Sequence, residues 1–279
     1  MNDTLSLSQA KHMPKVATKK VFELIWLYAG RVGIGVGFCA VWWALVYFEI
    51  VPAFFVSTPG AVAIYLWENA GGEITTHGID TLIAMMIAFS LSGIAGILGG
   101  LLLVEMPVFR RLVDPYLTGL NSMPRIALAP IFILWFGIGM GSKVALAFSL
   151  GFFIVLNSTI AGVRNIDPVL MRLSHTLGCS GIQRFWKITL PWAVPGVFAG
   201  LKLALIYSFL GVVTSEMIAS RSGLGYLVMY YSGVFRMDAI LGILFVMALA
   251  AIAITMVADA IEAKLVGNWT EPVMRADVN

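Results

Sequence analysis

The sequence predicts an all-α integral membrane protein with about six transmembrane helices and both termini in the cytoplasm. Of the 279 residues, 59% are hydrophobic and only 12% are charged, whereas soluble domains carry about 25% charged residues. The apolar residues form runs that approach or exceed the roughly 20 residues needed to cross a bilayer. Lysine and arginine are concentrated in alternate connections between these runs. Too few polar side chains remain to cover a water-facing surface, which excludes a soluble enzyme.

Six apolar runs are the candidate spans, and they define three parts of the chain. The polar segment 1–31 is predicted to be a cytoplasmic tail, in which 21–30 either lies at the lipid headgroups or extends the first span. Residues 32–263 form the predicted transmembrane domain, and 264–279 form a cytoplasmic C-terminal tail. The third run is short and contains Pro130, which disfavours a helix interior. The predicted spans are 32–48, 81–104, 126–142, 144–163, 190–215 (interrupted only by Lys202) and 239–258.

Basic residues give the orientation, because cytoplasmic loops of membrane proteins carry an excess of lysine and arginine. With the N-terminus inside, most basic residues fall in segments that are predicted to be cytoplasmic. The outer segment 49–80 contains acidic residues but no lysine or arginine, and the other outer segments hold only Lys143, Arg221 and Arg236. Both termini are therefore predicted to face the cytoplasm.

The cytoplasmic connection 164–189 is long and has a pattern of its own. Asp167 and Pro168 are typical of a helix start, since aspartate caps the first turn and proline suits the first helical position. Gly178 stands where a glycine would end that helix in a left-handed conformation. A second short apolar segment then leads into Leu190. Such a helix–turn–helix is either a docking surface for a soluble partner or a loop folded back on its own membrane domain, and spacing alone favours neither.

This connection resembles a signature of one transporter family. In binding-protein-dependent ABC importers, the membrane subunit carries Glu-Ala-Ala, three residues, Gly, nine residues, Ile, any residue and Leu-Pro. Gly178, Ile188, Leu190 and Pro191 fall at those spacings, and Thr176 and Leu177 are also typical. Arg172, Leu173 and Ser174 stand at the Glu-Ala-Ala positions, so the glutamate is absent.

Further motifs resemble the branch of that family that handles nitrate, sulfonates, taurine and bicarbonate. Together they cover roughly residues 114–226 and continue into the last span. They are Pro124-Arg125, Pro130, Trp-Phe-Gly-Ile-Gly at 135–139, Glu-Met-Ile at 216–218 and Gly-Leu-Gly-Tyr at 223–226.

The resemblance implies a permease of the type I ABC importer fold, located in a bacterial inner membrane and without ATPase activity of its own. Two permease copies, expected to be identical, would form the pathway for a small anion or organic acid. Two soluble ATPases, which bind ATP and Mg, would dock underneath through the coupling helix of 164–189. A substrate-binding protein would deliver cargo from outside. No cofactor is expected in this chain itself.

Polar residues in or beside the spans are costly there and tend to face cavities or partner helices. Arg125 would attract an anion, although it is also explained as a cytoplasmic anchor. Asn157 and Ser158 are explained equally well by hydrogen bonds between helices, and Glu216 by an ion pair with Arg221. The candidate pathway residues are Asn121, Arg125, Asn157, Ser158, Thr214, Ser215 and Glu216.

Two other segments have more than one interpretation. Lys202 lies in the first half of the fifth run, within reach of the cytoplasmic interface by snorkelling. The aromatic-rich segment 220–238 is either a re-entrant gate helix that a binding protein could touch or an aromatic belt at the membrane surface.

Other classes of function lack their residues. The glycine-rich segment 137–143 fails the phosphate-loop pattern, because Ser142 stands where lysine is required. The histidines are scattered and the two cysteines lie far apart, so neither a metal site nor a disulfide framework is predicted. No basic stripe for nucleic acid occurs. The alternative to the importer is an ion-coupled secondary transporter, which would need acidic or histidine residues mid-span.

Overall fold

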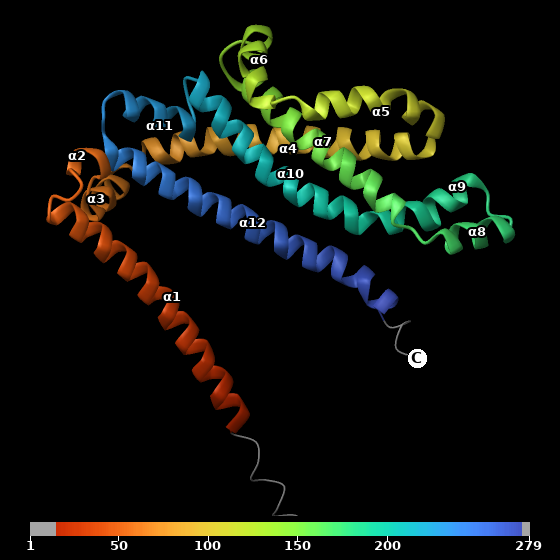
Figure 1. Ribbon diagram of the computed structural model, residues 1–279, viewed down its shortest axis with the longest axis horizontal. Helices are drawn as coiled ribbons and strands as arrows, with labels where there is room; N and C mark the ends of the chain where they lie inside the picture. The colour runs from red at the N-terminus through yellow and green to blue at the C-terminus, as the bar shows by residue number, and fades with distance from the viewer. Residues whose placement is uncertain (1–14, 275–279) are drawn as a thin grey trace, which may run out of the picture. The chain divides into compact units, whose positions relative to one another are not determined.

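The computed structural model describes the backbone of residues 15–274 and the side chains of residues 26–264 other than Tyr28. Over this range the chain is helical and contains no β-strand (Figure 1). The 3₁₀ turn η2 (Arg125–Leu128) precedes α6, and the π-helical turn η3 (Phe185–Thr189) precedes α10. The α-helices are α1 (Lys15–Tyr47), α2 (Ala53–Val56), α3 (Pro59–Asn69), α4 (Glu73–Glu105), α5 (Pro107–Ser122), α6 (Ala129–Phe136), α7 (Met140–Arg164), α8 (Pro168–Thr176), α9 (Gly181–Arg184), α10 (Leu190–Ile218), α11 (Leu224–Gly233) and α12 (Met237–Met274).

Five of the described helices are long and apolar enough to cross a membrane. They are α1, α4, α7, α10 and α12, and each overlaps one of the predicted spans. A sixth candidate is the pair formed by α5 and the segment η2–α6, which is bent by 87° at its break. The prediction of a helical membrane protein with about six spans is therefore confirmed.

The prediction that 126–142 forms one continuous span is wrong. α6 has only 8 residues and ends at Phe136. Gly137 and Gly139 follow with φ angles of 76° and 153°, conformations that glycine adopts far more readily than other residues. The last residues of the run, from Met140 onward, already belong to α7. The candidate crossing at this place is therefore the bent pair of α5 and η2–α6, which has the geometry of a broken span or of a re-entrant loop.

The chain divides into two compact units, residues 1–64 and 65–279, with the boundary inside α3. In the first unit, α1 runs without a break from Lys15 to Tyr47. The segment 21–30 thus continues the first span as part of one helix. The second unit contains all the side-chain clusters described below.

Within the second unit, α4, α7 and α10 pack along one another (Figure 1). Small residues allow the backbones of α7 and α10 to approach closely. A Cβ atom on Gly196 would lie 2.7 Å from the Cα of Gly162, and one on Gly200 would lie 2.4 Å from the Cβ of Ser158. Packing of this kind is a usual basis of helix association in membranes.

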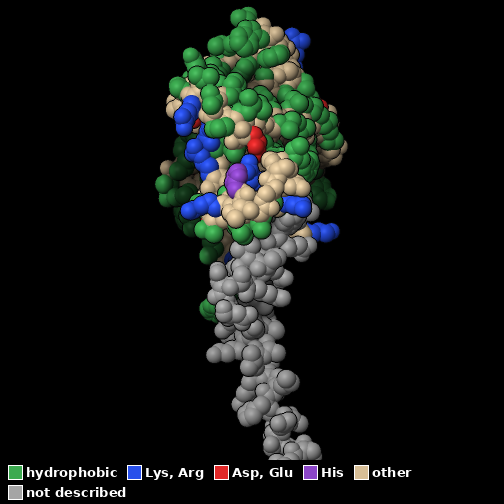
Figure 2. Space-filling model, turned by 90° about the vertical axis from the view of Figure 1, so that its right-hand side faces the viewer, with side chains coloured by type: hydrophobic (Ala, Val, Ile, Leu, Met, Phe, Trp, Pro, Cys, Tyr) green, Lys and Arg blue, Asp and Glu red, His purple; other side chains and the backbone are tan. Residues whose placement is uncertain are grey.

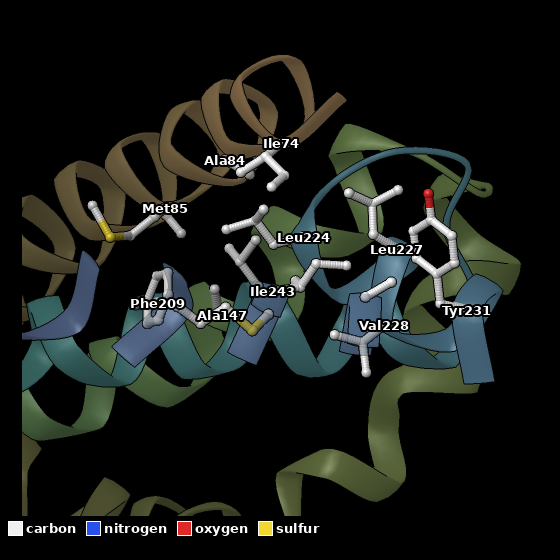
Figure 3. Packing of buried hydrophobic residues seen from close by; sticks show 14 of the residues in the cluster. Ile74, Ala84, Met85, Ala147, Phe209, Leu224, Leu227, Val228, Tyr231 and Ile243 are labelled. Atoms are coloured by element: carbon white, nitrogen blue, oxygen red, sulfur yellow. The ribbon is translucent and has the colours of Figure 1, made fainter. Parts of the chain in front are cut away.

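An apolar cluster joins α4, α7, α10, α11 and α12 at one end of these helices (Figure 3). Leu224, Leu227 and Val228 bring α11 into the cluster, and Ile243 brings in α12. The short helix α11 is therefore packed against the longer helices rather than exposed as a free loop.

Lys202 of α10 forms ion pairs with Asp259 and Glu262 of α12, the latter at 3.5 Å between Nζ and Oε2. The ammonium group thus finds acidic partners within the protein. Lys202 belongs to the contact between two spans, whereas the sequence suggested that it reaches toward the membrane surface by itself.

Candidate functional site

The connection between α7 and α10 begins each of its short helices with a capped turn, and the sequence predicted the first. The Asp167 carboxylate accepts a hydrogen bond from the Val169 amide at 2.7 Å, and Pro168 occupies the first turn of α8. At α9, the Gln183 amide donates to Ser180 Oγ at 3.3 Å, and the Ser180 amide donates to Gln183 Oε1 at 3.0 Å. This reciprocal pair is a capping box, so local side chains fix where both helices start.

The end of α8 depends on Gly178, as the sequence predicted. The Gly178 amide donates to the His175 carbonyl, and the Cys179 amide donates to the Ser174 carbonyl, each at 3.0 Å. These two bonds form the helix-ending motif that requires a left-handed residue, and Gly178 has a φ angle of 70°. The chain therefore turns sharply between α8 and α9.

One side of this connection packs against its own membrane domain. Met171 of α8 and Ile188 of η3 contact a buried cluster formed by Val163, Ile166 and Ala193 at the ends of α7 and α10. The connection also leads into α10 through the π-helical turn η3, an unusual geometry that often occurs at functional sites. Displacement of α8 and α9 would therefore act directly on the start of α10.

The other side of the connection is apolar and exposed. Its large apolar side chains are between 51% and 74% exposed. Arginine side chains accompany them, and Arg184 Nη1 lies 2.6 Å from His175 Nε2. Figure 2 views the molecule from this end and shows basic side chains among apolar ones. We call the following residues the apolar face of α8–α9: Val169, Leu173, Leu177, Ile182 and Trp186.

The predicted coupling residues divide between these two sides. Leu173 and Leu177 lie in the apolar face. Arg172, Thr176 and Gly178 are also exposed, whereas Ser174 is buried and Ile188, Leu190 and Pro191 are half-buried. One side of the connection is therefore folded back on its own domain, and the other side is exposed; its role as a docking surface stays a prediction.

Arg125 in η2 is at the centre of a separate cluster of contacts. Its guanidinium carbon lies 4.5 Å from the centre of the Phe153 ring, and Nη1 donates to the Leu150 carbonyl at 3.4 Å. Nη2 also hydrogen-bonds to the Asn121 side chain, beside a hollow of about 260 Å³. Asn157 is exposed and lies one turn beyond Phe153, on the same face of α7. Arg125 and Asn121 are therefore in contact beside this hollow, and Asn157 lies on the side of α7 that carries Phe153.

The remaining predicted pathway residues lie elsewhere. Ser158 lies in the contact between α7 and α10, and Thr214 donates to a carbonyl of its own helix at 2.7 Å. Ser215 and Glu216 are each only 1% exposed and are enclosed by neighbouring helices. The pathway proposed below is therefore restricted to the residues around Arg125.

Glu216 forms a buried ion pair with Lys143, whose Nζ lies 2.9 Å from Glu216 Oε1. The exposed fractions of the two side chains are 2% for Lys143 and 0% for Glu216. Glu216 thus pairs with Lys143 and not with Arg221, a pairing that was one of the two alternatives left open by the sequence, and Lys143 lies in a helix rather than in a connection. The reason is that α7 begins at Met140, before the uncharged run, which places Lys143 in its first turn beside the end of α10.

Further hydrogen bonds surround this pair and involve α4 and α11. Thr81 of α4 donates to the Glu216 carboxylate at 2.9 Å, and the Gly225 amide of α11 donates to it at 3.0 Å. Lys143 also donates to the Ser222 carbonyl at 2.8 Å. The pair therefore binds α4, α7, α10, α11 and the turn between the last two into one polar centre.

Gly223 in that turn allows the carboxylate to lie against the backbone. A Cβ atom at this position would be 1.9 Å from Glu216 Oε1, and the φ angle of Gly223 is 106°. Its amide donates to His77 Nδ1 at 2.9 Å. Both the close approach and the backbone conformation require glycine here.

A polar pocket of about 560 Å³ lies beside this turn, between the start of α4 and α11. Tyr231 donates to Glu73 at 2.6 Å, and burial raises the pKa of the Tyr231 hydroxyl, which keeps it protonated. Arg221 is exposed and makes no ion pair with any residue whose side chain is described. The residues that line the pocket include Glu73, His77, Arg221, Tyr226, Tyr230 and Arg236.

Comparison with known proteins relates the chain to transport proteins. A family model described as "Binding-protein-dependent transport system inner membrane component" matches residues 92–268. The taurine transport system permease protein TauC of Escherichia coli (strain K12) is 28% identical over 250 residues, which are 86% of this chain and 91% of the relative. The riboflavin transport system permease protein RibX of Chloroflexus aurantiacus is 29% identical over 270 residues, 96% of this chain and 99% of the relative.

Among solved structures, the fold is similar to a chain of the MetNI methionine ABC transporter in an inward-facing conformation. The TM-score is 0.58 at 18% sequence identity, over 65% of this chain and 91% of the other. At this level of sequence identity, the similarity is evidence for the fold alone.

Proposed function

The chain belongs to the family of binding-protein-dependent transport system inner membrane components, and on that premise we propose that it carries a small anion or organic acid into a bacterial cell at the expense of ATP hydrolysed by a separate subunit. It is a multi-pass permease subunit of an ABC importer with the type I fold. The substrate class and the physical coupling to the ATPase are the parts that we propose.

The apolar face of α8–α9 is the single observation that carries the proposed coupling to an ATPase. Five large apolar side chains are exposed on a connection rich in charged residues, and such patches on water-facing surfaces mark interaction sites. The opposite side of the same connection is fixed to the start of α10. A soluble subunit that binds this face can therefore push on a membrane helix.

Two further partners follow from the other polar groups. The face around Arg125 is open, so a pathway there needs a second wall, which we assign to a second copy of this chain. The pocket at the α11 end offers Arg221 without an acidic partner among the described side chains. We assign that end to the substrate-binding protein, and the α8–α9 end to the cytoplasm together with both termini, in agreement with the distribution of basic residues.

The proposed substrate class rests on Arg125 and on the relatives. A guanidinium group recognises carboxylate or sulfonate oxygens, and TauC is named for taurine, which carries a sulfonate. RibX is named for riboflavin, so a panel of substrates is required to identify the cargo. ATP and Mg would bind to the partner ATPase, and this chain would need no cofactor of its own.

Affinity purification of the chain from its native host tests the proposal. We expect a soluble ATPase to be recovered with the unaltered chain, and to be lost when Leu177 and Ile182 of the apolar face are replaced by glutamate. Recovery of the ATPase in equal amount with that variant would contradict the assignment of the face.

A further inference from the structure

α10 connects the two functional ends of the second unit. It begins at Leu190, directly after the connection that carries α8 and α9, and ends at Ile218, shortly before α11 (Figure 1). Its 29 residues correspond to a length of about 43 Å at 1.5 Å per residue. A displacement received at the α8–α9 end therefore has one long helix through which it can reach α11.

The peptide turn between α10 and α11 would be a weak mechanical link without side-chain support. Residues 219–223 are not helical, and two of them, Ala219 and Gly223, have extended or left-handed backbone conformations. Side chains bridge this turn. Glu216, in the last turn of α10, accepts a hydrogen bond from the Gly225 amide in the first turn of α11. Lys143 of α7 binds both Glu216 and the Ser222 carbonyl within the turn.

A buried ion pair is not needed to hold α11 in place. Such a pair is costly to form, and replacing it with well-packed hydrophobic residues of similar volume is often neutral or stabilising. The stabilising apolar contacts of α11 are supplied separately by Leu224, Leu227 and Val228. The ion pair instead fixes the relative positions of the helices that it joins, because charge-assisted hydrogen bonds have a specific geometry.

We propose that Lys143 and Glu216 are positioning residues that fasten the first turn of α11 to α7 and α10, so that α11 moves with these helices during the transport cycle. Thr81 of α4 belongs to the same device, because it donates to Glu216 and accepts from the Leu224 amide at 2.9 Å. The inference rests on the proposed function, since it assumes an ATP-driven movement of α10.

The test uses the complete transporter, reconstituted with its ATPase and binding protein, and measures substrate transported per ATP hydrolysed. In the double variant K143M/E216Q both charges are removed, while glutamine can still accept from Gly225 and Thr81. We expect ATP hydrolysis to continue and the transport-to-ATP ratio to fall about tenfold, as expected for loss of a coupling contact. A matched control is K202M, which removes the half-exposed lysine of the other ion-paired site in α10 and should leave the ratio unchanged.

A ratio equal to that of the unaltered protein in K143M/E216Q would overturn the inference. If this variant does not assemble, T81V decides the question, because it removes one hydroxyl from the network and leaves the ion pair in place. A lowered ratio in T81V supports the inference, and an unchanged ratio overturns it. Absence of ATP-driven uptake by the unaltered transporter would instead contradict the proposed function, so the two failures are distinguishable.

Discussion

Lys143 and Glu216 are 73 residues apart in sequence, yet Lys143 Nζ lies 2.9 Å from Glu216 Oε1. Both side chains are almost completely enclosed by protein. The pair brings together the start of α7, the end of α10 and the start of α11, with Thr81 of α4 as a fourth contact. It is the most strongly buried charge contact among the described residues, and it lies at the opposite end of α10 from the proposed ATPase surface.

Removal of one member of this pair should destabilise the protein far more than removal of both. In K143M the Glu216 carboxylate stays buried without its cation, and a loss of about 3–5 kcal/mol in the free energy of unfolding is expected. In K143M/E216Q no unpaired charge remains, so most of this loss should be recovered. Unfolding of the purified protein in mixed micelles measures both values, and equal losses in the single and double variants would show that the charges do not interact.

Replacement of Gly178 by valine should abolish transport and leave the protein in the membrane. The residue has a φ angle of 70°, a conformation that costs a β-branched residue about 1–3 kcal/mol, so α8 and α9 would change their relative direction. Gly181 provides the matched control, because it lies in the same connection, has no positive φ and has no neighbour within 4 Å of an added Cβ. G181A should transport normally. Uptake by G178V at the rate of G181A would be inconsistent with a role for this turn.

A negative charge in the apolar face of α8–α9 should weaken binding of the ATPase. Ile182 is 74% exposed and Leu177 is 71% exposed, so I182E and L177E should fold normally and lose the apolar contact with the partner. Loss of one such anchor is expected to reduce affinity by about tenfold or more. The control Q183E adds the same charge nearby and preserves the capping box. Binding of the ATPase to detergent-solubilised permease measures the effect, and a similar reduction in Q183E would attribute it to charge alone.

Replacement of Arg125 by glutamine should slow transport without preventing ATP hydrolysis. The guanidinium lies over the Phe153 ring and faces a hollow that is open in this structure, so its loss would remove the cation that attracts an anionic substrate. R125K retains the charge and should be partly active. Initial uptake rates over a range of substrate concentrations give the comparison, and equal rates for R125Q and the unaltered protein would remove this face from the proposed pathway.

Local features of the chain could be predicted well from the sequence. The apolar runs gave α1, α4, α7, α10 and α12, because length and composition suffice to recognise a spanning helix. Asp167 and Gly178 act through neighbours within a few residues, so the start and end of α8 could be predicted from residue type. Which apolar side chains of this connection are exposed became clear only from the structure, and their exposure agrees with a docking surface.

Features that depend on distant residues could not be predicted. α5 could not be recognised from the sequence as part of a candidate span, because Arg110, Arg111 and Asp114 interrupt its apolar pattern. Arg110 and Asp114 form an ion pair along the helix. The partner of Glu216 lies on another helix, and only its position in space distinguishes Lys143 from the nearer Arg221. A lysine directly beside a predicted span was the one available signal, since buried charges in membrane proteins are usually paired.

Uptake into proteoliposomes is the most direct test of ATP-driven import by this permease. The vesicles would contain the chain with its co-purified ATPase, the binding protein and the substrate panel outside, and ATP with Mg inside, while ionophores collapse the proton and sodium gradients. We predict uptake of at least one small anion or organic acid that requires ATP and continues without the gradients. Uptake that stops when the gradients collapse would contradict the importer and identify the chain as an ion-coupled carrier. Uptake that proceeds without the ATPase would also contradict the importer.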